Sequence, residues 1–209
     1  MTVLLLDDRW PSLIPMEAHG RLAGPVSFTD EIPVRVRWNF DSFVAPEGPG
    51  VLVSTNEDDP QVVRRIVAGE PVIEAESRRD PLRQAVRVMS RARSIGEWES
   101  VQTHRSLLPF LAEESQEFAD AVVEWEVDGD EVKLRTELGD VLLQVLFHAE
   151  LASRRGAFDF ADVADSFVAK LRSRAPYLFD GSTRMVSEAE QHRLWQMGKA
   201  RENQLPPGR

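Results

Sequence analysis

The stretches Glu113-Glu114-Ser115-Gln116-Glu117 and Glu137-Leu138-Gly139-Asp140 dominate the sequence. Each contains two carboxylates three positions apart, a spacing that places both on one face of an α-helix. Each also lies within a segment rich in Leu, Val, Phe and Ala, where a charge is normally paired, protonated or bound to a metal. The two stretches therefore predict two amphipathic helices that share a cation site.

A short turn, Val127-Asp128-Gly129-Asp130, separates the two predicted helices. Helices joined in this way pack antiparallel, so residues 114–117 are expected within one or two turns of residues 137–140. A single Glu-x-x-Glu is more simply a solvated surface, but two pairs that interrupt apolar stripes on neighbouring helices favour a site. The candidate ligands are Glu114, Glu117, Glu137 and Asp140. Gly139 weakens the helix but leaves room for a close neighbour or ligand.

The residue types in this set narrow the choice of cation. Carboxylates without His or Cys suit Mg²⁺, Mn²⁺ or Ca²⁺. A di-iron bundle would need Glu-x-x-His, which does not occur, and an EF-hand loop beginning at Asp128 would have Gly139 at its twelfth position instead of an acid. Mg²⁺ is the best candidate, with Mn²⁺ as the alternative, and Mg²⁺ usually shares its coordination shell with substrate phosphates.

Composition excludes several classes of protein. The chain has 209 residues, 42% of them hydrophobic, a formal net charge of -10 and no cysteine. The negative charge argues against a nucleic-acid polymer as partner, and the lack of cysteine excludes disulfides and thiol catalysis. The apolar run at residues 3–6 is too short for a signal peptide, and no stretch is long enough to span a membrane. We expect a cytoplasmic protein.

The chain has two halves of different character. Residues 1–78 predict a small α/β module, with strands at 3–6, 51–54 and 72–73 and a helix at 60–68. This half contains neither a GxGxxG motif nor a Walker loop, and its role is open. Residues 80–203 predict helices at 81–93, 106–125, 131–153, 160–174 and 187–202, with a frayed tail at 204–209.

The predicted fold is mainly α, a four-helix-bundle-like domain behind the small α/β module. The helix at 131–153 is apolar nearly all round, which is typical of a central, buried helix. With one such helix among roughly four, its apolar face can be covered within the chain or by a second copy.

Phosphates would need cations near the carboxylates. Lys170 and Arg174 are four residues apart on one predicted helix, as are Trp195 and Lys199 on another. Taken singly, each cation is more simply a solvated or helix-capping charge, and Trp195 a core residue. Lys133, one turn before Glu137, is most simply the partner of that carboxylate in a salt bridge.

Residues 98–107, 111–121 and 137–149 closely resemble the MazG-type nucleoside triphosphate pyrophosphohydrolases, which belong to an all-α superfamily with the signature EExxE followed by ExxD. The resemblance extends over about residues 80–203, and the α/β segment in front is similar to that of actinobacterial members. It implies Mg²⁺ ligation by Glu114, Glu117, Glu137 and Asp140, and support of the site by Lys133. It also implies substrate contacts from Lys170, Arg174, Trp195 and Lys199. The family's usual Arg-His-Pro-His-Val-Phe is replaced by residues 174–179, Arg-Ala-Pro-Tyr-Leu-Phe.

The activity implied by the resemblance is Mg²⁺-dependent hydrolysis of nucleoside triphosphates (NTP or dNTP) to the monophosphate and pyrophosphate, in nucleotide-pool housecleaning. It also implies a homodimer or higher homo-oligomer. The alternative is a low-turnover nucleotide-binding regulatory or partner-docking module. The altered segment at residues 174–179 favours this alternative, and the complete set of carboxylates and cations argues against it.

Overall fold

The structure is a computed structural model that describes residues 1–204. Residues 205–209, which make up most of the tail predicted to fray, lie outside the described part. The chain divides into two compact units, with the boundary between Ala85 and Val86.

The first unit is built on a parallel four-stranded sheet in the order β2-β3-β1-β4. The strands are β1 (Thr2–Leu5), β2 (Val26–Phe28), β3 (Val51–Ser54) and β4 (Val72–Glu74). In register, Thr2 lies opposite Val51, and Val3 lies opposite Val72. Two α-helices accompany the strands, α1 (Val34–Asn39) and α2 (Pro60–Val67), with 3-10 turns at η1 (Met16–Ala18), η2 (Phe40–Phe43) and η3 (Glu76–Arg79).

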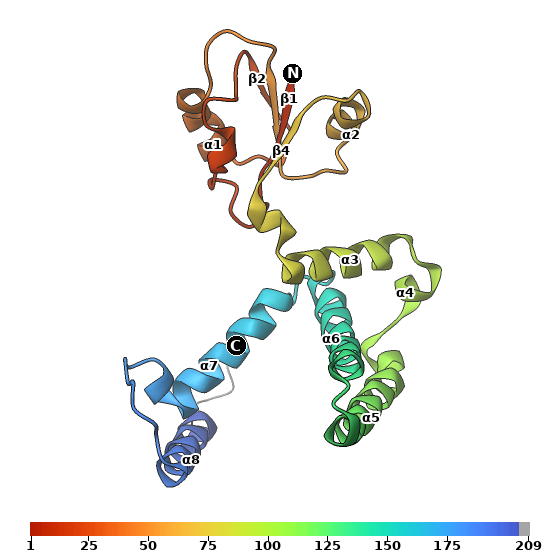
Figure 1. The fold of residues 1–209 in the computed structure, drawn as a ribbon, viewed down its shortest axis with the longest axis vertical. Helices are drawn as coiled ribbons and strands as arrows, with labels where there is room; N and C mark the ends of the chain where they lie inside the picture. The colour runs from red at the N-terminus through yellow and green to blue at the C-terminus, as the bar shows by residue number, and fades with distance from the viewer. Residues whose placement is uncertain (205–209) are drawn as a thin grey trace. The chain divides into compact units, whose positions relative to one another are not determined.

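The two central strands of this unit, β1 and β3, are buried on both faces, as expected for the middle of a parallel sheet covered by helices. Leu4 and Leu6 pack with Val36 and Phe40, which belong to α1 and η2. The alternate residues Val3 and Leu5 pack with Leu52 and Val62 on the other face, under α2. Figure 1 shows α1 and α2 on opposite sides of the strands. Strand β2 and helix α1 were not predicted, because each is short and each directly follows a proline.

The second unit is helical. It contains α4 (Glu97–Val101), α5 (His104–Asp128), α6 (Glu131–Ser153), α7 (Phe160–Arg174), the turn η4 (Pro176–Leu178) and α8 (Glu188–Gln204). Helix α3 (Pro81–Ile95) crosses from the first unit into the second. Helices α5 and α6 lie side by side as a hairpin, and α8 packs against α7 (Figure 1). The prediction of a mainly helical chain with a small α/β module is confirmed.

The turn of the α5–α6 hairpin is formed by the cap at the end of α5 and the cap at the start of α6. Gly129 adopts a left-handed conformation with a φ of 73°, which caps α5, and the Asp130 carboxylate accepts hydrogen bonds from the backbone N–H groups of Val132 and Lys133 to start α6. Helix α5 begins earlier than predicted. Thr103 and Ser106 form a reciprocal capping box, so Pro109 lies inside the helix and not in its first turn.

Helix α6 is only half buried, which corrects the prediction of a central helix. Its second half contributes Leu146, Phe147 and Ala149 to the core, whereas in the first half Val132 and Leu138 are 62% and 53% exposed. The apolar sequence therefore includes a face that a single chain leaves uncovered. None of the helices in residues 1–204 is long and apolar enough to cross a membrane.

Candidate active site

Three of the four predicted carboxylate ligands come together in the α5–α6 hairpin. Glu114 of α5 and Glu137 and Asp140 of α6 each offer a carboxylate oxygen, and these oxygens all lie within 4.8 Å of one another. The three side chains are half-buried. The spacing of three residues places Glu137 and Asp140 on one face of α6, and the turn at Gly129 brings that face against α5.

The carboxylates of this cluster repel one another, because no positive charge from residues 1–204 lies among them. Burial raises the pKa of Glu114, and the charges of Asp140, Glu117, Glu113 and Glu137 raise it further. An all-carboxylate set of this kind fits a hard divalent cation such as Mg²⁺ or Mn²⁺, which would relieve the repulsion. The identity of the ion does not follow from the geometry alone.

The remaining predicted members of this region lie outside the cluster. Glu117 is one turn from Glu114 and exposed, near enough to affect its pKa but not part of the ligand group. Lys133 forms its ion pair with Glu124 of α5 across the hairpin, and not the predicted pair with Glu137. A Cβ added at Gly139 would meet no atom within 4 Å, so the space beside the ligands is open.

The predicted aromatic and cationic groups lie on α7 and α8. The Arg174 guanidinium stacks over the Trp195 ring at 5.1 Å from its centroid, while its Nε and Nη2 donate to the Glu202 carboxylate at 3.1 and 2.5 Å. This ion pair raises the pKa of Arg174. Gly198 permits the close packing of α8 on α7, since a Cβ at this position would lie 2.6 Å from the Ser173 carbonyl oxygen.

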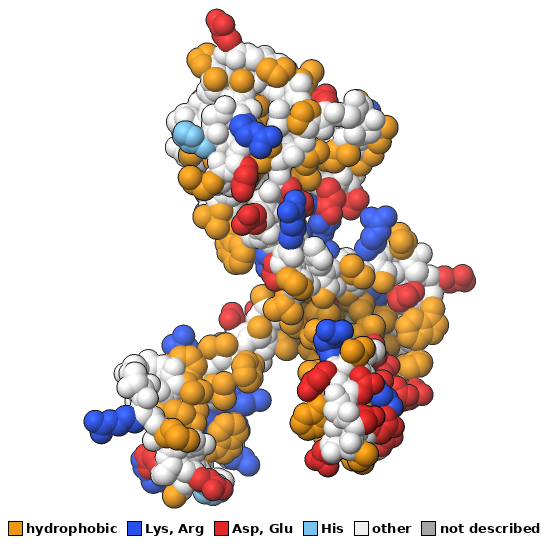
Figure 2. All heavy atoms as spheres, viewed as in Figure 1, with side chains coloured by type: hydrophobic (Ala, Val, Ile, Leu, Met, Phe, Trp, Pro, Cys, Tyr) orange, Lys and Arg blue, Asp and Glu red, His pale blue; other side chains and the backbone are white. Residues whose placement is uncertain are grey.

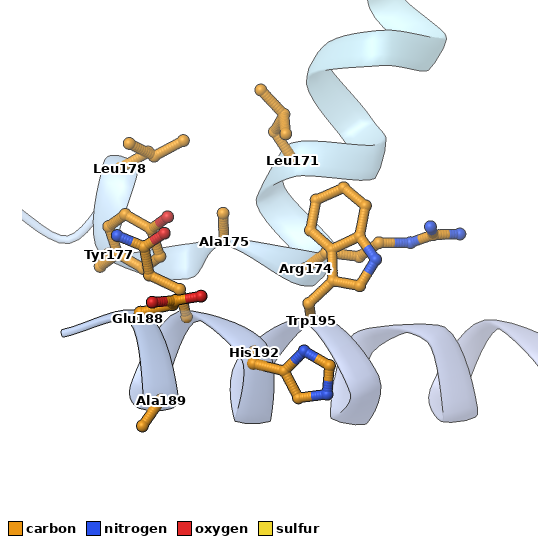
Figure 3. Close-up of a pocket in the computed structure, with 10 residues that line it drawn as sticks. Leu171, Arg174, Ala175, Tyr177, Leu178, Glu188, Ala189, His192 and Trp195 are labelled. Carbon is orange, nitrogen blue, oxygen red and sulfur yellow. The ribbon is translucent and has the colours of Figure 1, made fainter. Parts of the chain in front are cut away.

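An open groove of about 750 Å³ lies beside Trp195. Figure 3 shows Trp195 of α8 beside the end of α7, and Tyr177 of η4 farther along the same groove. Leu171 and Ala175 contribute its apolar lining. The groove thus offers an aromatic face, apolar side chains and the polar groups of Glu188, Gln191 and His192, a combination that suits a flat heterocycle.

Lys170 and Lys199 are exposed. They belong to the α7–α8 pair together with Arg174 and Trp195, whereas the carboxylates belong to α5–α6. Figure 2 shows acidic side chains gathered over α5–α6 and basic ones spread over α7–α8. The structure therefore brings together Glu114, Glu137 and Asp140 on one helix pair, and Arg174 and Trp195 on the other.

Several side-chain partners in this unit were not predicted from the sequence. Glu202 forms an ion pair with Arg174, and Glu124 forms one with Lys133. His104 is hydrogen-bonded to His148, with 2.7 Å between their Nδ1 atoms. Each of these pairs joins different helices, so no spacing in the sequence indicates it. His148 is partly buried and lies outside the ligand group.

The chain has an α/β module followed in sequence by a helical hairpin with an acidic cluster. These features define a class of helical proteins with a site suited to a divalent cation. Residues 1–73 match the model of the MazG N-terminal domain, and residues 102–179 match that of the MazG nucleotide pyrophosphohydrolase domain. The chain belongs to the MazG family.

Two mycobacterial relatives align with nearly the whole chain. A nucleoside triphosphate pyrophosphohydrolase of Mycobacterium tuberculosis is 42% identical over 209 residues, which cover 97% of this chain and 62% of the relative. That of Mycolicibacterium smegmatis is 40% identical, over 98% of this chain and 64% of the relative. The chain thus spans less than two thirds of the length of these relatives. The crystal structure of a mazG-related protein from Thermotoga maritima aligns with a TM-score of 0.49 and 27% identity, over 56% of this chain and 97% of that one.

Proposed function

We propose that this protein hydrolyses nucleoside triphosphates to the monophosphate and pyrophosphate in a Mg²⁺-dependent reaction. The observation that carries the proposal is the cluster of Glu114, Glu137 and Asp140 inside the matched pyrophosphohydrolase domain. The names of the mycobacterial relatives support the same activity.

The carboxylate cluster would hold the cation, with Glu114, Glu137 and Asp140 as ligands. Mg²⁺ bound there would offset the negative charge of the phosphate oxygens. Glu117, exposed on the same face one turn away, would complete the set and orient the attacking water toward the α-phosphorus. In this reaction the water oxygen would bond to the α-phosphorus. The bond between the α-phosphorus and the oxygen that bridges to the β-phosphate would break, so that pyrophosphate leaves.

The α7–α8 pair would hold the substrate. Trp195 presents one face of its indole to Arg174, and its other face is left for a nucleobase. Lys170 and Lys199 would contact the phosphates, because their ammonium groups are exposed. Arg174 would have to exchange its bond to Glu202 for one to a phosphate, or else act by fixing the indole.

We also infer a homodimer or higher homo-oligomer. The exposed apolar residues in the first half of α6 support an oligomer, since a large uncovered apolar face marks an interface. The separation of the carboxylates and the cations on two helix pairs supports a site that a second copy completes. A cytoplasmic role in clearing unwanted nucleotides from the pool would fit stacking of the base on Trp195, because stacking tolerates different bases.

The reaction is tested by incubating the 209-residue chain with a panel of NTPs and dNTPs and Mg²⁺ or Mn²⁺, and by measuring pyrophosphate and inorganic phosphate separately. Equal amounts of pyrophosphate and monophosphate are expected. Release of inorganic phosphate alone would indicate a different hydrolase, and binding without turnover would indicate the regulatory module.

A further inference from the structure

The carboxyl edge of the parallel sheet has the topology that opens a crevice in α/β sheets, the place where such sheets bind ligands. Strands β1 and β3 are neighbours. The connection that leaves β1 packs Ala18 and Leu22 on one face of the sheet, whereas α2, which follows β3, packs Val62 on the other. Where adjacent strands send their connections to opposite faces, the loops separate and a crevice opens at the strand ends.

In this protein Arg78 of η3 fills that crevice. Its Nη1 donates to the carbonyl oxygens of Leu6, at the end of β1, and Thr55, at the end of β3, at 2.9 and 2.8 Å. Its Nε donates to Glu74 at 3.1 Å, and its Nη2 pairs with Glu57. The side chain is 1% exposed. Nearly all guanidinium donors are therefore used by the chain itself, and none points to a vacant anion site.

A second group of ion pairs fastens the following residues to the same edge. Asp7, whose side chain is fully buried, accepts from Arg9 and lies 3.5 Å from Arg83 at the start of α3. Arg83 also pairs with Asp8 at 2.6 Å, and Arg9 pairs with Asp80 at 2.8 Å. Arg78, Arg83 and Arg9 thus bond residues 78–83 to the ends of the strands, through acceptors that range from the fully buried Asp7 to the exposed Asp8.

Polar residues near the end of β3 are also hydrogen-bonded to one another. The Oε1 atom of Glu31 accepts from the Thr29 and Ser54 hydroxyls and from the Thr55 backbone N–H. Burial alone would raise the pKa of Glu31, but these hydrogen bonds lower it to about 2. The carboxylate therefore stays charged and bonded at neutral pH.

We propose that the N-terminal unit is an anchor for the segment that leads into α3, and that Arg78 occupies the crevice in the place of a ligand. The unit would then bind no nucleotide of its own. Its contribution would be to hold residues 76–83 in one conformation at the entrance to α3, the helix that continues into the catalytic unit.

The test compares Arg78→Met with Arg79→Met in the full 209-residue chain by hydrogen exchange. Arg79 is the adjacent arginine, but its side chain is 72% exposed and has one ion pair at 3.5 Å, so it is a matched control. Arg78→Met should accelerate exchange of the amides of residues 74–85 by about a hundredfold, because it removes the donor to the buried carbonyl oxygens of Leu6 and Thr55. Arg79→Met should change it less than about threefold.

Equal exchange in the two variants would overturn the proposal. So would protection of residues 54–57 and 76–83 in the unaltered protein by ATP or inorganic phosphate, since it would identify the crevice as a ligand site. If Arg78→Met prevents the unit from folding, Glu57→Gln, which weakens one of the four contacts, should still accelerate exchange in the same segment by about tenfold. No acceleration in Glu57→Gln would then contradict the anchor.

Discussion

Glu114 and Asp140 lie on different helices of one hairpin, yet their carboxylate oxygens lie within 4.8 Å of each other. Burial raises the pKa of Glu114, and Asp140 is the nearby charge that raises it most. Two like charges held this close destabilise the hairpin unless a cation lies between them. The charge repulsion within the site therefore lowers the stability of the metal-free fold.

Asp140→Asn should stabilise the metal-free protein by about 0.5 kcal/mol, because it removes one of the repelling charges. The same substitution should abolish the rise in melting temperature that Mg²⁺ produces in the unaltered protein, since a ligand that binds the native state stabilises it. Thermal melts with and without Mg²⁺ measure both effects. Glu113→Gln, outside the ligand group, should retain the Mg²⁺-induced rise. A Mg²⁺-dependent rise that survives in Asp140→Asn would contradict the assigned site.

The histidine pair predicts a pH dependence of stability. Arg155 Nη2 can only donate, so His104 Nε2 accepts at 3.0 Å, and the proton of His104 Nδ1 is donated to His148 Nδ1. Burial lowers the pKa of His148, and the charge of His104 lowers it further. Arg155 is the charged residue that donates a hydrogen bond to this pair.

Because the folded pKa of His148 is below its unfolded value of 6.5, the unfolded chain binds more protons. The free energy of unfolding should therefore be highest above pH 6.5 and should fall as the pH decreases below it. His148→Gln should flatten this dependence, whereas the exposed His192→Gln should not. Urea unfolding between pH 5 and about 8 measures how the free energy of unfolding changes with pH. An increase in this free energy on acidification would contradict the prediction.

Two glycines on different helices predict opposite effects of one substitution. Gly198→Ala should destabilise the protein by about 1–3 kcal/mol, because the new methyl group would collide with the backbone of Ser173 and Arg174. It should also raise the KM for NTP by displacing Trp195. Gly139→Ala should stabilise α6 by about 0.8 kcal/mol, since the space there is open.

Chemical denaturation of the two glycine variants gives both signs in one experiment. Destabilisation by Gly139→Ala would show that the space beside the carboxylates is filled in solution, and a neutral Gly198→Ala would contradict the close packing of α8 on α7.

The hairpin and its carboxylates could be predicted from the sequence because their signals are local. Helical periodicity, the turn at Gly129 and the spacing of Glu137 and Asp140 all act within a few residues. The short elements β2 and α1 could not be predicted, since tertiary packing decides segments of so few residues.

The partners of the cations could not be predicted for a different reason. Arg174 and Glu202 are 28 residues apart on two helices, and their contact depends on how α8 crosses α7. The exposure of Leu138 likewise depends on what covers α6, which the apolar pattern does not specify.

The most direct test of the proposed activity compares Glu114→Gln with Glu113→Gln, two neighbouring glutamates of which only Glu114 belongs to the cluster. The measurement is Mg²⁺-dependent release of pyrophosphate from NTPs, with circular dichroism to confirm that both variants fold. We expect kcat/KM to fall by about a hundredfold or more in Glu114→Gln and by less than about threefold in Glu113→Gln. Equal activity in the two variants would contradict the assignment of the carboxylate cluster as the catalytic metal site.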